Sequence, residues 1–197
     1  MAISKTTSWS VLLLLLASSS AWAAKKDTCF ECHMVVKGPS QIFKDDVHYE
    51  NGISCVDCHG GDPNDEGDSS MSAARGFKPR ITRDAVPDFC GTCHSDAAFM
   101  RKYKPGQRVD QLALYRKSGH GLQFAHGNTE TALCIDCHTT HNIRAVNDPQ
   151  SAVSPSRLAE TCRFCHEAVF KESTHAKVFA IKDMAACSVC HSSHGPE

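Results

Sequence analysis

The twelve cysteines constrain this 197-residue chain more than any other feature, because all of them belong to one short motif. The motif is Cys-x-x-Cys-His, it occurs six times, and no cysteine is left over. Its cysteine pairs are Cys29 and Cys32, Cys55 and Cys58, Cys90 and Cys93, Cys134 and Cys137, Cys162 and Cys165, and Cys187 and Cys190. The histidines that complete the motifs are His33, His59, His94, His138, His166 and His191. One spacing repeated six times indicates one chemistry repeated six times.

This motif is the attachment signature of c-type haem, and its spacing has a physical reason. On a helical turn, two thiols three residues apart share a face, so both can bond to the vinyl groups of one porphyrin. The histidine that follows then lies under the macrocycle, where its imidazole can bind the iron as the first axial ligand. The sequence therefore predicts six covalently bound haem c groups, each with its iron.

Three other interpretations of the cysteines fit less well. A redox Cys-x-x-Cys does not require the histidine that follows it here. Zinc sites typically use two cysteine pairs per metal, without a histidine after each pair. A disulfide framework would not repeat a single spacing six times.

The second axial ligand decides what each haem can do, since a second strong ligand closes the iron to substrates and an open position leaves room for chemistry. Beyond the motifs the chain holds six further histidines, one for each predicted haem. They are His48, His120, His126, His141, His175 and His194. We expect these six to be the second ligands, because no methionine is both well placed and repeated relative to the motifs.

Four of the six second-ligand candidates occupy duplicated positions. His120 and His175 each follow a Ser-x dipeptide, and His141 and His194 each lie three residues after a motif histidine. Duplicated offsets favour a shared role over four unrelated surface histidines. His48 precedes the second motif by a few residues and follows the same pattern less closely.

The motifs fall into three two-haem modules, at about residues 29–59, 90–141 and 162–194. The first module lacks a closing histidine, because Asp62 stands at that position, while the middle module has the extra His126. His126 either fills the vacancy, from within the chain or from a neighbouring subunit, or is a bystander.

The N-terminus predicts export. Lys5 precedes a short apolar run, residues 9–17, and small residues then lead to Ala21-Trp22-Ala23. This is the layout of a secretory signal peptide over residues 1–23, because the run is about half the ~20 residues that a membrane anchor needs. We expect residues 24–197 to form a single hexahaem domain in the periplasm or at the cell surface.

The predicted fold is mainly short α-helices and irregular coil wrapped around a stacked haem chain, with few or no strands. Aliphatic residues are sparse beyond the signal peptide, so the porphyrins must supply much of the apolar core. Ser154-Pro155 predicts the start of a helix that runs through the fifth motif, and residues 109–117 have helical spacing that ends at Gly119.

The doubled motifs resemble the multihaem cytochromes c, a superfamily of tetrahaem cytochromes and octahaem hydroxylamine- and tetrathionate-converting enzymes. The most specific parts are Ser118-Gly119-His120-Gly121 and the Cys-x-x-Cys-His-x-x-His segment from Cys134 to His141. The resemblance implies that histidines at these positions are second ligands, that the haems pack in stacked and T-shaped pairs, and that maturation follows export. The matched count of haems and histidines leaves no obvious open iron, unlike the enzymes of the group.

These observations predict an electron-transfer cytochrome that links a quinol-oxidising membrane complex, such as a membrane cytochrome b, to periplasmic or extracellular redox proteins. Two alternatives stay open: an oxyanion reductase with one open haem, and a protomer of an extracellular cytochrome filament, a homo-oligomer. The chain carries 21 Lys and Arg against 22 Asp and Glu, and it has no basic stripe that would predict nucleic-acid binding.

Overall fold

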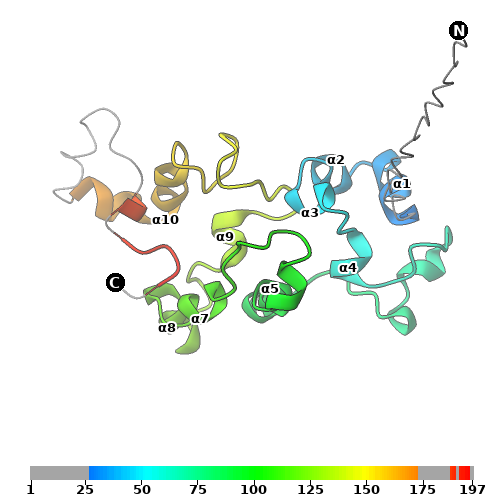
Figure 1. Cartoon of the computed structure of the whole chain (residues 1–197), viewed down its shortest axis with the longest axis horizontal. Coiled ribbons are helices and arrows are strands. Elements are labelled where there is room, and N and C mark those ends of the chain that lie inside the picture. Colours follow the sequence, from blue (N-terminus) through cyan, green and yellow to red (C-terminus); the bar gives the residue numbers. More distant parts are fainter. Residues whose placement is uncertain (1–26, 173–186, 190, 196–197) are drawn as a thin grey trace, which may run out of the picture.

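The structure is a computed structural model that describes residues 27–172, 187–189 and 191–195. The predicted signal peptide, His175 and Cys190 lie outside these residues. The described chain consists of short helices joined by turns and irregular chain (Figure 1). The helices are α1 (Thr28–Val35), α2 (Ser40–Phe43), α3 (Val47–Glu50), α4 (Cys55–His59), η1 (Asp68–Met71), η2 (Ala73–Arg75), η3 (Arg83–Ala85), α5 (Val86–His94), α6 (Ala97–Met100), α7 (Gln111–Tyr115), α8 (Gly119–Ala125), α9 (Cys134–His138), α10 (Leu158–Glu172) and η4 (Cys187–Val189).

The described chain forms an elongated molecule. Helix α1 lies at one end and α10 at the other, with α4, α5 and α9 between them (Figure 1). None of the described residues belongs to a β-strand. The predicted fold class, short helices and coil without strands, is confirmed.

Two predicted helices exist with different bounds. The predicted helix over residues 109–117 is the shorter α7, and Gly119 does not end it but opens α8, with Ser118 as the N-cap. Helix α10 begins at Leu158, three residues after Pro155, because Ser154 first closes a turn in which its carbonyl accepts from the amides of Arg157 and Leu158.

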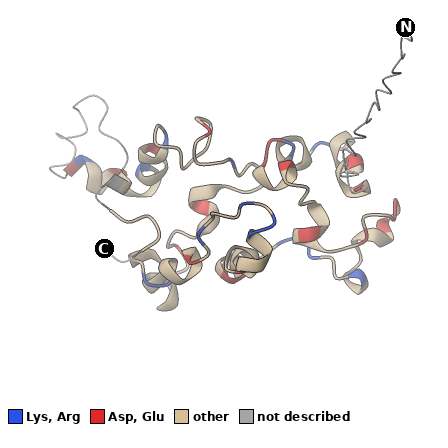
Figure 2. Cartoon of the chain, viewed as in Figure 1, with Lys and Arg blue, Asp and Glu red and all other residues tan. Residues whose placement is uncertain are grey.

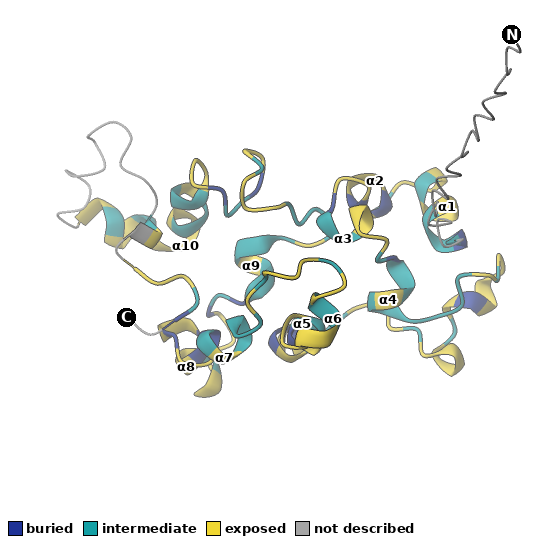
Figure 3. Cartoon of the chain, viewed as in Figure 1, coloured by how far each residue is buried: buried dark blue, intermediate teal, exposed yellow. Residues whose placement is uncertain are grey.

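The apolar core of the polypeptide is small. Among the described residues, the buried apolar side chains are Phe43, Val86, Tyr115 and Leu133. The last three form one cluster between α5, α7 and the start of α9. Buried residues occur as separate patches along the ribbon rather than as one continuous layer (Figure 3). A chain with so little apolar packing of its own depends on another source of buried apolar surface.

Acidic and basic side chains are interspersed along the length of the described chain (Figure 2). No helix in the described part of the chain has both the length and the apolar character that crossing a membrane requires.

Candidate haem centres

Five of the six motifs lie on helices, which are α1, α4, α5, α9 and α10. The first three residues of the sixth motif form η4. Helices α4 and α9 consist of the motif alone, from the first cysteine to the histidine. A helical turn brings both thiols to one face, so the local structure fits attachment of one porphyrin to each pair.

An aspartate inside the motif explains why such short helices form. In α4, Asp57 accepts a hydrogen bond of 2.8 Å from the backbone amide of Ser54, and in α9 Asp136 accepts one of 2.7 Å from that of Leu133. These bonds satisfy amides that a helix start leaves unpaired. Arg83 fixes Asp136 in turn, donating two hydrogen bonds of 3.0 and 2.7 Å to its carboxylate.

Asp27 plays a related role between the first two motifs. One of its carboxylate oxygens accepts from the amides of Cys29 and Phe30 at the start of α1, at 3.1 and 3.3 Å. The other accepts from the amide of Cys55 at the start of α4, at 3.3 Å. One side chain therefore caps two motif helices and holds them together.

Successive motifs are neighbours throughout the chain. Helix α1 contacts α4, α5 contacts α9, and α10 contacts η4. Thiols of consecutive motifs also lie close enough to interact electrostatically, and those of the third and fourth motifs and of the fifth and sixth motifs are close enough to hydrogen bond. The thiol pairs are Cys29 and Cys55, Cys58 and Cys93, Cys90 and Cys134, Cys137 and Cys165, and Cys162 and Cys187. The six motifs thus form one continuous series in chain order.

Four motif histidines face a second histidine at nearly the same separation. The ring centroids of His48 and His94 are 6.0 Å apart, those of His59 and His141 5.9 Å, those of His120 and His166 6.0 Å, and those of His138 and His194 5.9 Å. A first-row metal bound at about 2 Å by an imidazole nitrogen on each side keeps the ring centres roughly 6 Å apart. The spacing of all four pairs therefore fits two axial ligands of one iron.

The electrostatics also favour metal binding, because a ligand imidazole must be neutral. Burial first, and then the neighbouring His194 and His94, lower the pKa of His138 to about 4. Burial is also the main cause of the lowered pKa of His141 and His194. These three imidazoles are neutral at pH 7.

The pairs connect different modules by reciprocal exchange. His48 of the first module faces His94 of the second, while His141 of the second faces His59 of the first. In the same way, the middle and last modules exchange partners. These pairs are His120 with His166, and His194 with His138.

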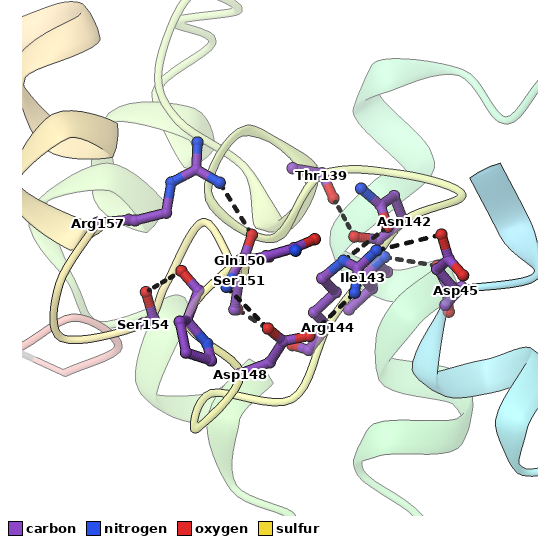
Figure 4. A network of polar contacts seen from close by, with 12 residues as sticks. Asp45, Thr139, Asn142, Ile143, Arg144, Asp148, Gln150, Ser151, Ser154 and Arg157 are labelled. Carbon is purple, nitrogen blue, oxygen red and sulfur yellow. Dashed lines mark hydrogen bonds and ion pairs between the residues drawn. The ribbon is translucent and has the colours of Figure 1, made fainter.

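A polar network holds the His141 segment against the first module (Figure 4). Ile143 donates its amide to Asp46 at 2.6 Å and accepts from the amide of Val47 at 2.7 Å. Arg144, which is only 18% exposed, pairs with Asp45 at 3.3 Å and with Asp148 at 3.0 Å. Backbone and side-chain contacts together fix the segment that carries His141.

The Ser-x-His-Gly segment has a structural role as well. Ser118 accepts from the amide of Gly121 at 3.2 Å and donates to the carbonyl of Tyr115 at 2.7 Å. A Cβ atom on Gly121 would lie 1.9 Å from that same carbonyl oxygen, so only glycine fits. The motif thus turns the chain sharply from α7 into α8, which carries His120 toward His166.

The other predicted site residues are placed as follows. His33 is exposed on α1, and His126 is exposed at the C-cap of α8. Neither ring pairs with another aromatic ring among the described residues. His191 follows η4, and its candidate partner His175 lies outside the described residues. Asp27, Asp46 and Arg83 were not predicted from the sequence, because aspartate and arginine in an otherwise polar chain carry no distinguishing signal.

Comparison with protein families decides the class of this chain. The family model for cytochrome c3 matches residues 47–167, which is more than half of the chain. The chain belongs to the cytochrome c3 family. A second model, for cytochrome c554 and c-prime, matches residues 15–60 of this cytochrome and includes its first two motifs. Searches of curated proteins and of solved structures gave no significant match.

This multihaem c-type cytochrome therefore binds haem c covalently and serves in haem-based electron transfer. Haem supplies reversible one-electron chemistry at its iron, and the protein supplies attachment, orientation and axial ligation. The cysteine pairs are the residues that would hold the haems, and the facing histidines are those that would bind the irons.

Proposed function

We propose that this cytochrome carries six haem c groups and passes electrons along them from one end of the molecule to the other. The observation that carries the proposal is the set of four histidine pairs at 5.9 to 6.0 Å, which are spaced to close both axial positions of four irons. A closed iron exchanges electrons without binding a substrate. The unbroken series of neighbouring motifs keeps each step between sites short.

The remaining ligands follow from this assignment. His191 takes His175 as its second ligand, by analogy with the Ser-x-His setting that His175 shares with His120. Two histidines then have no assigned partner within the chain. They are His33 in α1 and His126 at the C-cap of α8. Because α1 and α8 lie toward opposite ends of the molecule, we propose that His126 does not complete the first site of its own chain (Figure 1).

We further propose that the protein is exported and acts in the periplasm or at the cell surface. The N-terminal pattern of a basic residue, an apolar run and small residues supports cleavage after Ala23. Its electron donor is then a quinol-oxidising membrane complex, such as a membrane cytochrome b, and its acceptors are periplasmic or extracellular redox proteins. Haem propionates add negative charge to the near-neutral chain and favour partners with basic faces.

The experiment that tests the function is a redox titration of the intact mature protein, followed by reduction with quinol-reduced membranes. We expect six one-electron equivalents per chain, reversible oxidation and no turnover of nitrite or tetrathionate. Catalytic consumption of either oxyanion at a rate above that of free haem would contradict a carrier role.

The second candidate function is that of a filament protomer, and it is favoured by His33 and His126, whose rings pair with no other aromatic ring in the described part of the chain. In a head-to-tail assembly, His126 of one copy would bind the first haem of the next. If so, His126→Ala shortens the assemblies in light scattering and opens one iron in six, seen as high-spin iron by electron paramagnetic resonance. If the first haem is instead open in the wild type, cyanide binds one equivalent of iron with or without His126, which favours the enzyme.

A further inference from the structure

The buried carboxylate of Asp46 contacts His48 and the backbone near His141, the proposed second ligands of two neighbouring haem sites. Asp46 is the N-cap of α3 and is 1% exposed. Its Oδ1 accepts from the backbone amide of His48 at 2.8 Å and from His48 Nδ1 at 2.9 Å. Its Oδ2 accepts from the amide of Ile143 at 2.6 Å. Both oxygens of this carboxylate are therefore occupied by donors.

The contact with His48 has a direct chemical consequence. When Nδ1–H donates to a carboxylate, Nε2 is left free for a metal, the ring orientation is fixed, and the imidazole becomes a stronger donor. A more basic ligand and a nearby negative charge both favour ferric over ferrous iron. His59 offers a comparison, because its Nδ1 donates to the neutral carbonyl of Lys78 at 2.8 Å.

The contact with Ile143 concerns the neighbouring site. Ile143 lies two residues beyond His141, which faces His59 of the second motif. The amide of Val47 returns a hydrogen bond to the Ile143 carbonyl at 2.7 Å. Asp46 thus holds the backbone that carries His141 while it orients His48 for the third motif.

We propose that Asp46 is a positioning residue that lowers the redox potential of the third haem site, through His48, and keeps His141 aligned at the second. The inference depends on the proposed function, because it takes His48 with His94 and His59 with His141 as axial pairs. Through this carboxylate, the polypeptide gives the second and third haem sites different redox potentials.

The third site can be recognised in the intact protein. Its two imidazole planes are inclined by 81°, whereas those of His59 and His141 are inclined by 12°. Near-perpendicular imidazoles give low-spin ferric haem a paramagnetic resonance signal with a large maximum g value, and near-parallel imidazoles give a rhombic signal. In a potentiometric titration of the wild-type holoprotein, the large-g signal should persist to lower potential than the rhombic signals. Its earlier loss would overturn the inference without any variant.

The decisive variant is Asp46→Asn, which keeps the size and one acceptor oxygen but removes the charge. We expect six haems and low-spin iron as before, with the large-g signal alone moved to higher potential. A tenfold loss of the preference for ferric iron corresponds to a shift of about 59 mV. Asp45→Asn is the matched control, since Asp45 is 49% exposed and pairs with Arg144 instead of a histidine. It should leave the large-g signal in place.

Asp46→Glu keeps the charge and covers the case in which the Asn variant assembles poorly. In this variant the large-g signal should be lost at nearly the same potential as in the wild type. An Asp46→Asn protein with intact haems and an unmoved large-g signal would overturn the inference while leaving the electron-transfer proposal standing. If His48→Ala leaves the large-g signal intact, the axial pairing itself is wrong and the proposed function is what fails.

Discussion

His59 and His141 face each other with ring centroids 5.9 Å apart and planes inclined by 12°. His141 is only three residues beyond the histidine of the fourth motif, yet it faces the second motif. The backbone explains this, because Thr139 and His141 both have positive φ angles, of 68° and 57°. Those two residues turn the chain away from α9 and toward the first module. The reciprocal pair of His48 and His94 completes a crossed connection between the modules.

Removing one of these second ligands should open one iron. We expect His141→Ala and His194→Ala each to convert one haem in six from low spin to high spin, because a missing imidazole weakens the ligand field. The double variant should contain two more high-spin equivalents than the wild type, measured by electron paramagnetic resonance of the oxidised protein. His126→Ala in monomeric protein is the control, and it should contain no more high-spin iron than the wild type. An entirely low-spin His141→Ala protein would contradict the pairing.

The ring planes give a second test of the same assignment. The pair of His138 and His194 is inclined by 17°, close to parallel, whereas His48 and His94 are inclined by 81°. We expect His48→Ala to remove a signal with a large maximum g value and His194→Ala to remove a rhombic one. If both variants lose the same type of signal, the described ring orientations are not those of the ligated protein.

Gly121 should tolerate no side chain. A Cβ atom there would lie 1.9 Å from the carbonyl oxygen of Tyr115, so Gly121→Ala forces α8 away from α7 at a cost of about 1–3 kcal/mol. Denaturant unfolding followed by circular dichroism measures the loss, and high-spin iron at the His166 site should accompany it as His120 moves. Gly119→Ala is the matched control, because nothing lies within 4 Å of its added Cβ. Equal stability of the two variants would contradict the close approach.

Replacing Thr139 with glycine should not lower stability, as a glycine substitution usually does. Its φ of 68° and ψ of −172° belong to a region that glycine favours, where other residues store about 1–3 kcal/mol of strain. Thr139→Gly also loses a hydrogen bond of 3.1 Å to the Asn142 carbonyl, worth about 1 kcal/mol. We expect stability to stay the same or rise by about 1 kcal/mol. Thr140→Gly, next along the chain and without positive φ, should lower it by about 0.5–1 kcal/mol.

Gly60 supports this interpretation of Thr139. It occupies the equivalent place after the histidine of α4, with φ of 69° and ψ of −162°. The two motif helices therefore end in the same backbone conformation, once with glycine and once with threonine. If Thr139→Gly proves as destabilising as Thr140→Gly, the strain at Thr139 is not real.

The sequence predicted the helical class and the positions of the haem motifs, because the Cys-x-x-Cys-His spacing is itself a local structural requirement. It did not predict which histidine faces which motif. That pairing depends on positive φ at Thr139 and His141 and on the contact of Asp46 with Ile143, a residue distant in sequence. The start of α8 at Gly119 was not predicted, and the start of α10 was placed too early, because the Ser154 carbonyl first closes a turn with the amides of Arg157 and Leu158.

The most direct test of the account is a structure of the haem-loaded protein that resolves both axial ligands at each iron. We predict six haems in chain order, with irons between His48 and His94, His59 and His141, His120 and His166, and His138 and His194. A loaded structure in which His141 binds the haem of its own Cys134 motif, or in which fewer than six haems are attached, would contradict it.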